Sequence, residues 1–353
     1  MRGSEGDAGL RSLVERVEGS VRGLPTGDDF WQRAVCATAL LRSDHPEAGS
    51  TARRWLDEAV DAQTSDGRLC YGGVGVTRFD GFDTSTVSAT RDFRRTALST
   101  GYFGTPLLDL HERTGEDRYL AAAVRQADAI LAGPRGAAGF LMMNAARPEL
   151  WIDSVYPMGF LARLGALTGE ATYADEAHRQ LRHVEEHLVD HRTGLVRHLW
   201  LERPDSYPDG CFWSRGTGWH VAALAEVVEA LPGHAEAGRA GDVLAGLLTA
   251  VVARQDATGL FHDVLDDPGS PLESSGTLLI AYALALAGRL GLVGADRLDV
   301  ARRALAAVAR LVEPDGTSGR TSLPPGGPGC PLGKLPLTQG LFLLAAHHLG
   351  GPG

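Results

Sequence analysis

Apolar residues recur along the chain mainly at helical spacing, and the strict alternation of a half-buried strand is scarce. The pattern predicts twelve helices, near residues 8–22, 28–43, 48–62, 97–113, 117–132, 150–167, 171–188, 215–231, 235–254, 273–291, 296–312 and 336–349. The intervening stretches 64–95, 133–148, 190–213, 255–271 and 313–335 are predicted to be loops or short hairpins. We therefore expect an all-α fold.

Two pairs of predicted helices share the same junction. Thr114-Gly115-Glu116 and Thr168-Gly169-Glu170 each separate a helix from a second helix that opens near a tyrosine. The glycine supplies the left-handed residue that ends the first helix, and the polar residues after it can start the next one. Twelve helices in six hairpins, with a period of roughly 50–60 residues, indicate an internally repeated helical toroid.

Two architectures fit six helical hairpins: an open solenoid and a closed (α/α)6 barrel. An open solenoid needs polar repeats at its ends, whereas the last predicted helix, LTQGLFLLAAHHLG, is strongly apolar. That composition suits burial against the first hairpin, so we predict a single (α/α)6-barrel domain over residues 1–353. In such a barrel the long loops gather at one end, and ligand pockets form there.

Composition narrows the classes of partner. The chain has 353 residues, of which 44% are hydrophobic and 22% charged, and its net charge is −10. The acidic balance and the lack of a Lys/Arg cluster argue against a nucleic-acid partner. No apolar run approaches the length of a membrane span, and the N-terminal segment lacks the apolar region of a secretory signal. A cytoplasmic protein without a membrane partner is expected.

The four cysteines, Cys36, Cys70, Cys211 and Cys330, are far apart and form no C-x-x-C pair. We predict reduced thiols and no zinc site. The sequence also lacks the motifs G-x-G-x-x-G, G-x-x-x-x-G-K-[ST] and G-x-S-x-G, so neither nucleotide binding nor serine hydrolysis is supported.

Asp153 is predicted at the start of a helix in ELWIDSVYPMGFLARLG, between Trp151 and Tyr156. One interpretation is a helix cap, or a charge favoured by the helix dipole. The other is catalytic, because a carboxyl group flanked by aromatic rings is desolvated. Desolvation raises its pKa and suits it to donating a proton near neutral pH.

The segment CFWSRGTGW, residues 211–219, places two tryptophans and an arginine around two glycines. Arg215 and Trp219 share a helix face if the helix begins by residue 215. Gly216 and Gly218 cost helix propensity, which is understandable if something approaches the backbone closely. The segment forms either part of the core, with Arg215 stacked on a tryptophan, or a pocket. In a pocket, tryptophan receives a ring and the guanidinium binds a carboxylate.

Several histidines have two interpretations. His198, in GLVRHLWLERPD, is compatible with a surface position or with a site. His183 and His187 in HVEEH resemble H-E-x-x-H, but the glutamate is misplaced for a general base, so a solvated helix face is predicted. His262 lies with Asp263 in a loop that is expected to join the rim carrying Arg215. After this loop, Ser274 or Ser275 is expected to cap a helix.

Three of these segments, LWIDSVYPMGFLARLG, WSRGTGW and GLFHDVLDDPGSPLESSGTLLIAYALA, together resemble those of the unsaturated uronyl hydrolases in order and spacing. These are glycoside hydrolase families 88 and 105, the latter the unsaturated rhamnogalacturonyl hydrolases. The resemblance covers roughly residues 95–345. The motifs W-x-R-G-x-G-W and W-[IV]-D-x-x-[YF] are fairly specific in combination. The family fold is an (α/α)6 barrel, in agreement with the helix count.

The resemblance implies chemistry on sugars with a C4=C5 double bond, as left by polysaccharide lyases. That unit is a vinyl ether, so the first step is protonation at C4. Positive charge then appears at C5, water adds there, and the hemiketal collapses to release the partner sugar. One carboxyl group serves as acid and then as base, without a metal, a cofactor or a covalent intermediate.

Carried over by position, the resemblance makes Asp153 the proton donor and water activator. The positions that hold the unsaturated ring and its carboxylate match His198, Trp213, Arg215 and Trp219. Tyr156, which ends the second motif, and His262, on the rim, complete this part of the expected substrate-binding set.

One position departs from the family pattern. The family has a second aspartate in a D-N-x-N-P-G segment, and its place is taken by Ser99, which we keep among the expected binding residues. Ser99 supplies no negative charge to the developing cation. Either a nearby carboxylate substitutes (Asp80, Asp83 or Asp92), or the enzyme acts on a different small molecule through Asp153 alone, or hydrolysis is lost.

The leading hypothesis is an enzyme that hydrates and hydrolyses a small, carboxylated, sugar-like substrate. A protonation-initiated isomerase, cyclase or lyase on the same barrel is the second. A non-catalytic carbohydrate-binding toroid is the third, in which the environment of Asp153 has no catalytic meaning. The sequence predicts no oligomeric state.

Overall fold

A computed structural model describes residues 2–24, 30–69, 96–323, 326–327 and 329–350. In this part of the chain every predicted helix corresponds to one α-helix. They are α1 (Arg2–Arg22), α2 (Phe30–Leu40), α3 (Pro46–Asp61), α4 (Gly104–Thr114), α5 (Asp117–Leu131), α6 (Met158–Thr168), α7 (Ala171–Leu188), α8 (Ser214–Ala230), α9 (Ala237–Val252), α10 (Ser274–Arg289), α11 (Ala295–Ala309) and α12 (Pro336–Gly350). The prediction of an all-α fold is confirmed.

The predicted starts of three helices are wrong. The first helix begins at Arg2 and not near residue 8. The helix expected from residue 97 begins as a 3-10 helix, η2 (Ala97–Phe103), before α4. The helix expected from residue 150 begins as a strand, β1 (Glu149–Trp151), and a 3-10 turn, η3 (Ile152–Val155). Pro157 separates this turn from α6, because proline has no N–H with which to continue the hydrogen bonding of the preceding turn. Asp153 therefore lies in η3 and not at the start of an α-helix.

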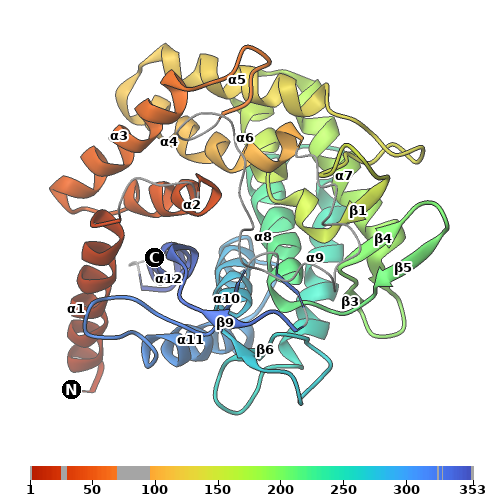
Figure 1. The fold of residues 1–353 in the computed structure, drawn as a ribbon. Helices are drawn as coiled ribbons and strands as arrows, with labels where there is room; N and C mark the ends of the chain where they lie inside the picture. The colour runs from red at the N-terminus through yellow and green to blue at the C-terminus, as the bar shows by residue number, and fades with distance from the viewer. Residues whose placement is uncertain (1, 25–29, 70–95, 324–325, 328, 351–353) are drawn as a thin grey trace.

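The helices form two concentric rings (Figure 1). The even-numbered helices contact one another in sequence around the inner ring, and α12 closes it against α2. Each odd-numbered helix packs outside an even-numbered one, and α1 packs on α12. These contacts confirm a closed (α/α)6 barrel and exclude an open solenoid. That the barrel is a single domain stays a prediction.

The ring in which a helix lies explains its pattern of burial. In α10, an inner helix, every residue from Ser274 to Ala287 is buried. In α7, an outer helix, burial is confined to one stripe that includes Tyr173, Leu181 and Leu188. An inner helix has protein on all sides and is apolar all round, whereas an outer helix needs one apolar face. The connections are those predicted, since Gly115 and Gly169 have φ of 71° and 76° after α4 and α6.

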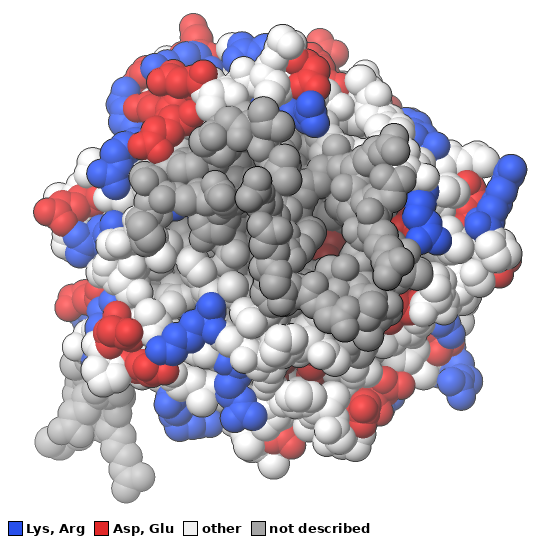
Figure 2. Space-filling view, in the orientation of Figure 1, with Lys and Arg blue, Asp and Glu red and all other residues white. Residues whose placement is uncertain are grey.

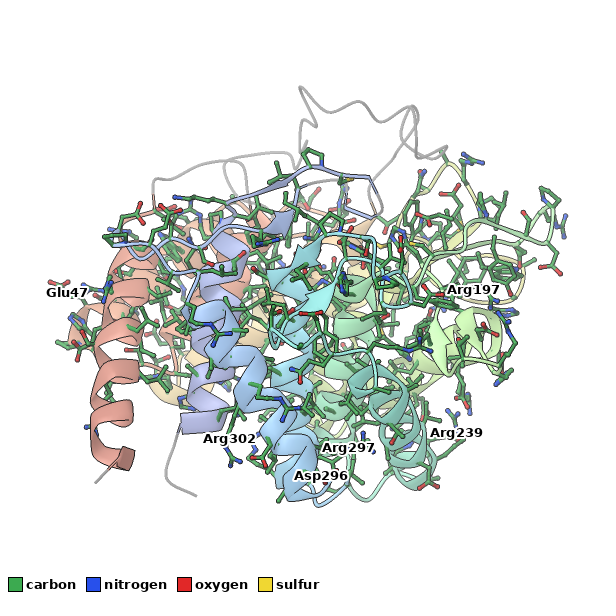
Figure 3. All side chains as sticks on the ribbon, turned by 90° about the horizontal axis from the view of Figure 1, so that it is seen from below. Glu47, Arg197, Arg239, Asp296, Arg297 and Arg302 are labelled. Carbon is green, nitrogen blue, oxygen red and sulfur yellow. The ribbon has the colours of Figure 1, made fainter. Side chains whose placement is uncertain are left out.

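Short antiparallel strands lie in the segments predicted as loops or hairpins, and they gather at one end of the barrel (Figure 3). One sheet has the order β1-β4-β5, with β4 (Leu199–Leu201) and β5 (Ser206–Asp209). Three two-stranded sheets pair β2 (Val189–Asp190) with β3 (Leu195–Val196), β6 (Phe261–His262) with β7 (Leu272–Glu273), and β8 (Thr321–Ser322) with β9 (Leu332–Gly333). Inner helices follow these strands, so their N-termini point to the same end.

The face seen in Figure 2 carries Lys/Arg and Asp/Glu side chains interspersed around its edge, without a gathering of positive charge. The expectation of no nucleic-acid partner stays a prediction. Among the described residues, none of the helices combines the length and the apolar character needed to cross a membrane.

A close approach of two inner helices, α8 and α10, gives a prediction about stability. A Cβ at Gly276 of α10 would lie 2.7 Å from the backbone N of Arg215 in α8, and nearer still to Ser214 Oγ. Gly276→Ala is therefore expected to lower the free energy of unfolding by about 1–3 kcal/mol through overpacking. Gly246 of α9 is exposed and has nothing within 4 Å of its Cβ position. As a matched control, Gly246→Ala should stabilise by roughly 0.5–1 kcal/mol, because alanine favours a helix. Urea denaturation measures both values, and equal stability of the two variants would contradict the packing.

Candidate active site

Asp153 sits where the first strand meets the inner ring. Trp151 pairs with Leu199 across β1 and β4, and Ile152 N donates to His198 O at 3.0 Å, which fixes the turn η3. Protein atoms surround the Asp153 carboxyl, yet part of the side chain touches open space, and Oδ1 is buried without a hydrogen-bond partner. Burial raises the pKa of Asp153, and the nearby His198 and Arg215 oppose that rise. The capping interpretation is wrong, because the residue at the N-cap of α6 is Pro157.

His198 is held beside this turn by a hydrogen-bonded carboxylate. Its ring is buried, and Nδ1 lies 2.7 Å from Asp209 Oδ2. Two tryptophan rings contact it, Trp151 roughly perpendicular to it at a centroid distance of 5.2 Å and Trp213 tilted against it at 4.8 Å. Although burial alone would raise the pKa of Asp209, its hydrogen bonds with His198 and Cys211 hold that pKa below its ordinary value. Because Nδ1 is bonded to Asp209, the other ring nitrogen of His198, Nε2, faces away from Asp209.

Arg215, at the start of α8, is buried and stacks on the ring of Trp213. Its Cζ lies 4.5 Å from the ring centroid. Nη1 donates to Ser322 O at 2.6 Å and to Ser275 Oγ at 3.3 Å, so α10 and the β8–β9 hairpin orient the guanidinium. The stacking expected for a core arginine is thus present, together with a fixed positive charge close enough to influence Asp153.

Two further carboxyl groups, Asp263 and Glu273, lie near Trp213 and Arg215. Neither was among the predicted site residues. Asp263 accepts a hydrogen bond from Trp213 Nε1 at 3.0 Å. Burial, and next the charge of Glu273, raise the pKa of Asp263 to about 7. Glu273 is fully buried and caps α10, accepting from Gly276 N, Ser275 Oγ and Ser322 N. The prediction that Ser274 or Ser275 caps this helix is therefore wrong.

The two glycines of the arginine segment accommodate protein. A Cβ at Gly216 would contact Ile152 and lie 3.0 Å from the Trp213 ring and 3.5 Å from Asp153 Oδ1. A Cβ at Gly218 would lie 2.6 Å from Leu279 Cβ. Gly216 thus brings the turn of Asp153 against α8, and Gly218 brings α8 against α10. The close approach was correctly predicted, but the neighbour is the chain itself.

Trp219 and Tyr156 lie in a second aromatic group, inside the barrel. Tyr156 stacks on Tyr102 with ring centroids 3.3 Å apart, and Trp219 meets Tyr102 edge-on at 5.4 Å. The Tyr156 hydroxyl donates to Leu98 O, which ties η2 to the turn of Asp153. These three rings line an interior cavity of about 60 Å³.

Ser99 and His262 have different surroundings. Ser99 lies in η2 and is buried, and its Oγ has no hydrogen-bond partner. Asp80, Asp83 and Asp92, the carboxylates expected to substitute for a family aspartate, lie outside the described residues. The ring of His262 bonds Ser270 O at 2.6 Å within its own hairpin, so its neighbour Asp263, and not His262, meets Trp213.

Two described groups have ligand atoms close enough to hold a metal ion. They are His198 with Asp209 and Cys211, and His183 with Glu186 and His187. The predicted solvated face at His183 and His187 is wrong. Both rings are half-buried, and His187 stacks on Trp200 with a centroid distance of 4.0 Å. Three of the four cysteines, Cys36, Cys211 and Cys330, are described. Cys211 and Cys330 are free thiols, and Cys36 Sγ donates a hydrogen bond to Pro336 O at 3.3 Å.

Known proteins resemble this chain in sequence. An unsaturated rhamnogalacturonyl hydrolase, YesR of Bacillus subtilis, is 34% identical over 228 residues, which cover 62% of this chain and 64% of that protein. An unsaturated 3S-rhamnoglycuronyl hydrolase of Alteromonas is 25% identical over 174 residues, which cover 47% of this chain and 42% of that protein. The chain thus spans less than two thirds of the length of each relative.

Solved structures share the fold over nearly the whole chain. A possible member of family GH105 from Klebsiella pneumoniae superposes with a TM-score of 0.80 at 22% identity, covering 96% of this chain and 92% of that one. The unsaturated glucuronyl hydrolase of Bacillus sp. GL1 superposes with a TM-score of 0.72 at 16% identity, covering 96% of both chains. The sequence profile of Glycosyl Hydrolase Family 88 matches residues 29–331, and the chain belongs to that family.

Proposed function

We propose that this protein hydrates the double bond of an unsaturated uronide, with Asp153 as proton donor, and thereby releases the sugar or group attached to it. The environment of Asp153 carries the proposal. Its carboxyl is enclosed by protein, Oδ1 has no partner, and burial raises its pKa. A carboxyl group in that state keeps its proton at a pH where an ordinary aspartate is ionised, as a general acid requires. Relatives named as unsaturated rhamnogalacturonyl and rhamnoglycuronyl hydrolases support the same substrate class.

The reaction begins with transfer of the Asp153 proton to C4. The C4=C5 electron pair forms the new C–H bond, and the ring oxygen stabilises the positive charge left at C5. Asp153, now a carboxylate, accepts a proton from water as the water oxygen bonds to C5. The resulting hemiketal opens to a ketone at C5, and the hemiacetal at C1 then breaks down to an aldehyde and the free alcohol. The net change is the addition of one water molecule.

The other residues bind and orient the substrate. The charge of the Arg215 guanidinium acts on Asp153, and this group suits the substrate carboxylate because both groups are planar. Trp213 provides a flat face beside it. His198, fixed through Nδ1 by Asp209, directs Nε2 to a substrate hydroxyl or to the attacking water. Tyr156 and Trp219 act from inside the barrel and shape the floor beneath Asp153.

The test is the near-ultraviolet absorption of the conjugated enol-ether acid, which hydration removes. Purified protein is incubated with unsaturated disaccharides that differ in the attached sugar. The proposal predicts loss of the band, with release of the attached sugar, for at least one rhamnose-linked or glucose-linked substrate. Unchanged absorption across the set would refute it.

Asp263 gives the reaction a pH dependence. Its pKa of about 7 means that the group is neutral at lower pH and ionised at higher pH. The ionised form places a second negative charge near Arg215, which opposes binding of a carboxylate. We therefore expect kcat/KM to fall as pH rises through about 7, by up to roughly tenfold per pH unit. In Asp263→Asn the fall should move to the pH at which Asp153 ionises. Identical pH profiles for the two proteins would rule out Asp263 as the group responsible.

A further inference from the structure

A second polar pocket lies at the end of the barrel away from the strands. It has a volume of about 500 Å³ and is lined by residues of α4, α6, α8 and α10, most of them in the C-terminal halves of these helices, together with Arg42, which follows α2. None of the residues assigned above to substrate binding or catalysis lines it.

Most charges in this pocket are compensated. Arg163 of α6 forms ion pairs with Asp109 and Glu112 of α4. Glu229 at the end of α8 pairs with Arg289 of α10 at 2.6 Å. These pairs leave Glu226 and Arg42 as the lining groups without an ion-pair partner among the described residues.

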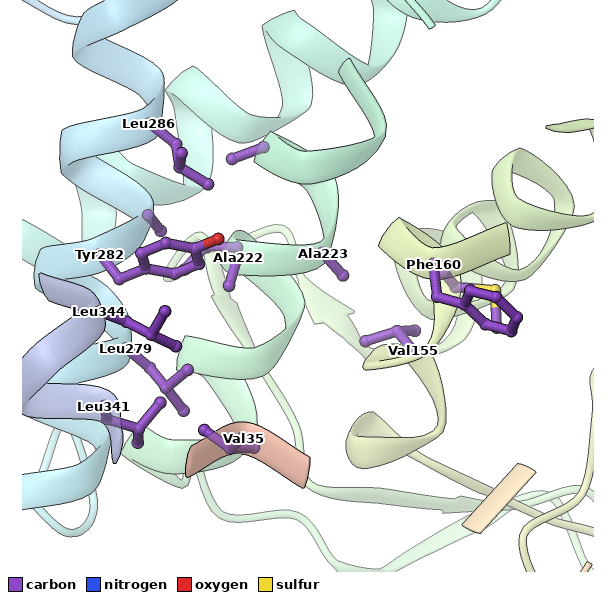
Figure 4. Packing of buried hydrophobic residues seen from close by; sticks show 14 of the residues in the cluster. Val35, Val155, Phe160, Ala222, Ala223, Leu279, Tyr282, Leu286, Leu341 and Leu344 are labelled. Carbon is purple, nitrogen blue, oxygen red and sulfur yellow. The ribbon is translucent and has the colours of Figure 1, made fainter. Parts of the chain in front are cut away.

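Glu226 is enclosed by the inner helices. Oε1 accepts a hydrogen bond from the Tyr282 hydroxyl at 2.9 Å. The carboxyl packs directly over Gly159 of α6, where any Cβ would collide with it. Figure 4 shows Tyr282 reaching from α10 toward α8, among apolar side chains that include Leu279 and Ala222. The second carboxyl oxygen of Glu226, Oε2, therefore lies against Gly159, where only a glycine leaves room for it.

Arg42 is the uncompensated charge. Its guanidinium lines this pocket, the interior cavity below Tyr156 and a third pocket beside α1. The guanidinium of Arg42 has no hydrogen bond or ion pair with a described residue, and its Nη1 is buried. Arg42 as a whole is half-buried, but a buried N–H donor such as Nη1 without a partner is costly, and an oxyanion that accepts from it removes the cost.

From these contacts we propose that the pocket binds a small oxyanion, a carboxylate or a phosphate, through Arg42. Glu226 in its protonated form is the second donor. The carboxylate source would be a sugar acid, and the phosphate source free inorganic phosphate. The proposal concerns binding at this end of the barrel and does not rest on the catalytic activity.

Binding at this pocket depends on pH through Glu226. The ionisable groups around it are Arg42, Asp109, Glu112, Arg163, Glu229 and Tyr282. His348, which packs on Tyr282, stays neutral because its pKa is lowered to about 3, mainly by burial. Burial raises the pKa of Glu226 to about 7, against the hydrogen bond from Tyr282. Below that pH Glu226 can donate to an anion, and above it the carboxylate repels one, so affinity falls as pH rises.

Isothermal titration with inorganic phosphate and with glucuronate tests the proposal. Because phosphate itself titrates near pH 7, the comparison one pH unit below and above about 7 uses glucuronate and, in place of phosphate, sulfate. The parent protein should bind at least one of the two anions, more tightly at the lower pH. Arg42→Gln should weaken that binding by roughly tenfold or more. Arg302→Gln removes the same charge from α11, where Arg302 pairs with Asp299 outside the pocket lining, and it should leave affinity within about twofold, because exposed ion pairs contribute little.

A catalytic-site control separates the two carboxylate sites. Binding that survives in Arg215→Lys but is lost in Arg42→Gln belongs to the pocket proposed here, and the reverse result overturns the proposal. Binding of phosphate alone identifies the inorganic anion as the ligand, and binding of glucuronate alone identifies a sugar acid. If Arg42→Gln does not fold, Glu226→Gln decides, since its affinity should no longer change with pH. Lack of binding by either anion, or a pH-independent affinity in the parent, refutes the site.

Discussion

Replacing Asp153 by Asn should lower kcat by about 10²–10⁴-fold, the usual contribution of a general acid or base. Asn keeps the size of the side chain, but it has no acidic proton for C4 and accepts none from water. The loss of kcat should approach the upper end of this range, because the same carboxyl protonates C4 and then accepts the proton of the attacking water. Steady-state kinetics on any substrate that the parent turns over measures the loss.

The fold of this variant should be intact. The folded-state pKa of Asp153 is raised, so the parent loses stability as pH rises through that pKa, and a side chain that does not ionise avoids the loss. Asp153→Asn should therefore melt at or above the temperature of the parent at neutral pH. Asp266→Asn, an exposed carboxylate in the β6–β7 hairpin, should leave kcat unchanged. Parent-like turnover in Asp153→Asn would remove Asp153 from the mechanism.

Arg215→Lys should lower kcat/KM by roughly 10²–10³-fold, or about 3–4 kcal/mol, which lies within the range of about 2–5 kcal/mol typical of a buried, hydrogen-bonded charge. Lysine keeps the charge, but it has no planar fork for a carboxylate and stacks poorly on Trp213. It also cannot keep the contacts of Nη1 with Ser322 and Ser275 while reaching the substrate. Most of the loss should be in KM if the arginine binds the substrate carboxylate equally well in the ground state and the transition state.

A methyl ester of the substrate tests what Arg215 binds. Esterification removes the carboxylate charge and should reduce kcat/KM of the parent strongly, but add little to the loss already present in Arg215→Lys, because the two changes remove one interaction. Equal losses on esterification in both proteins would show that Arg215 binds another group. Arg239→Lys, in an ion pair with Glu236 on the outer ring, serves as the control and should be neutral.

The helices could be predicted closely because each has a periodic apolar pattern of its own. The outer helix α7 was predicted at 171–188, the bounds it has in the structure, since one stripe of it is buried. The local pattern failed at Asp153, where β1 and η3 depend on pairing with β4, almost fifty residues later. Residues 150–152 are apolar and continue the apolar pattern of the helix that follows. Nothing in the local sequence shows that the backbone of residues 149–151 pairs with β4.

Residues of the candidate site could be proposed from the sequence only where they lie in local motifs. Asp153, Trp213 and Arg215 could be selected from their neighbours in sequence. Asp209 and Asp263 could not, because the β4–β5 hairpin and the bridge between Trp213 and Val264 bring them in. Helical spacing also gave no means of separating Trp219, which faces the barrel interior with Tyr102, from the stack of Trp213 and Arg215.

The central claim is that Asp153 delivers a proton to C4 of an unsaturated ring, and proton NMR of the product formed in D2O tests it most directly. Proton transfer from an enzyme-bound carboxyl places deuterium on one face of C4 only. The account therefore predicts a product with a single deuterium at C4 in one configuration, formed as the attached sugar is released, and no such product with Asp153→Asn. Release of the attached sugar with deuterium equally distributed between both C4 positions would contradict it, because the enzyme would then have cleaved the glycosidic bond and left the double bond to react in solution.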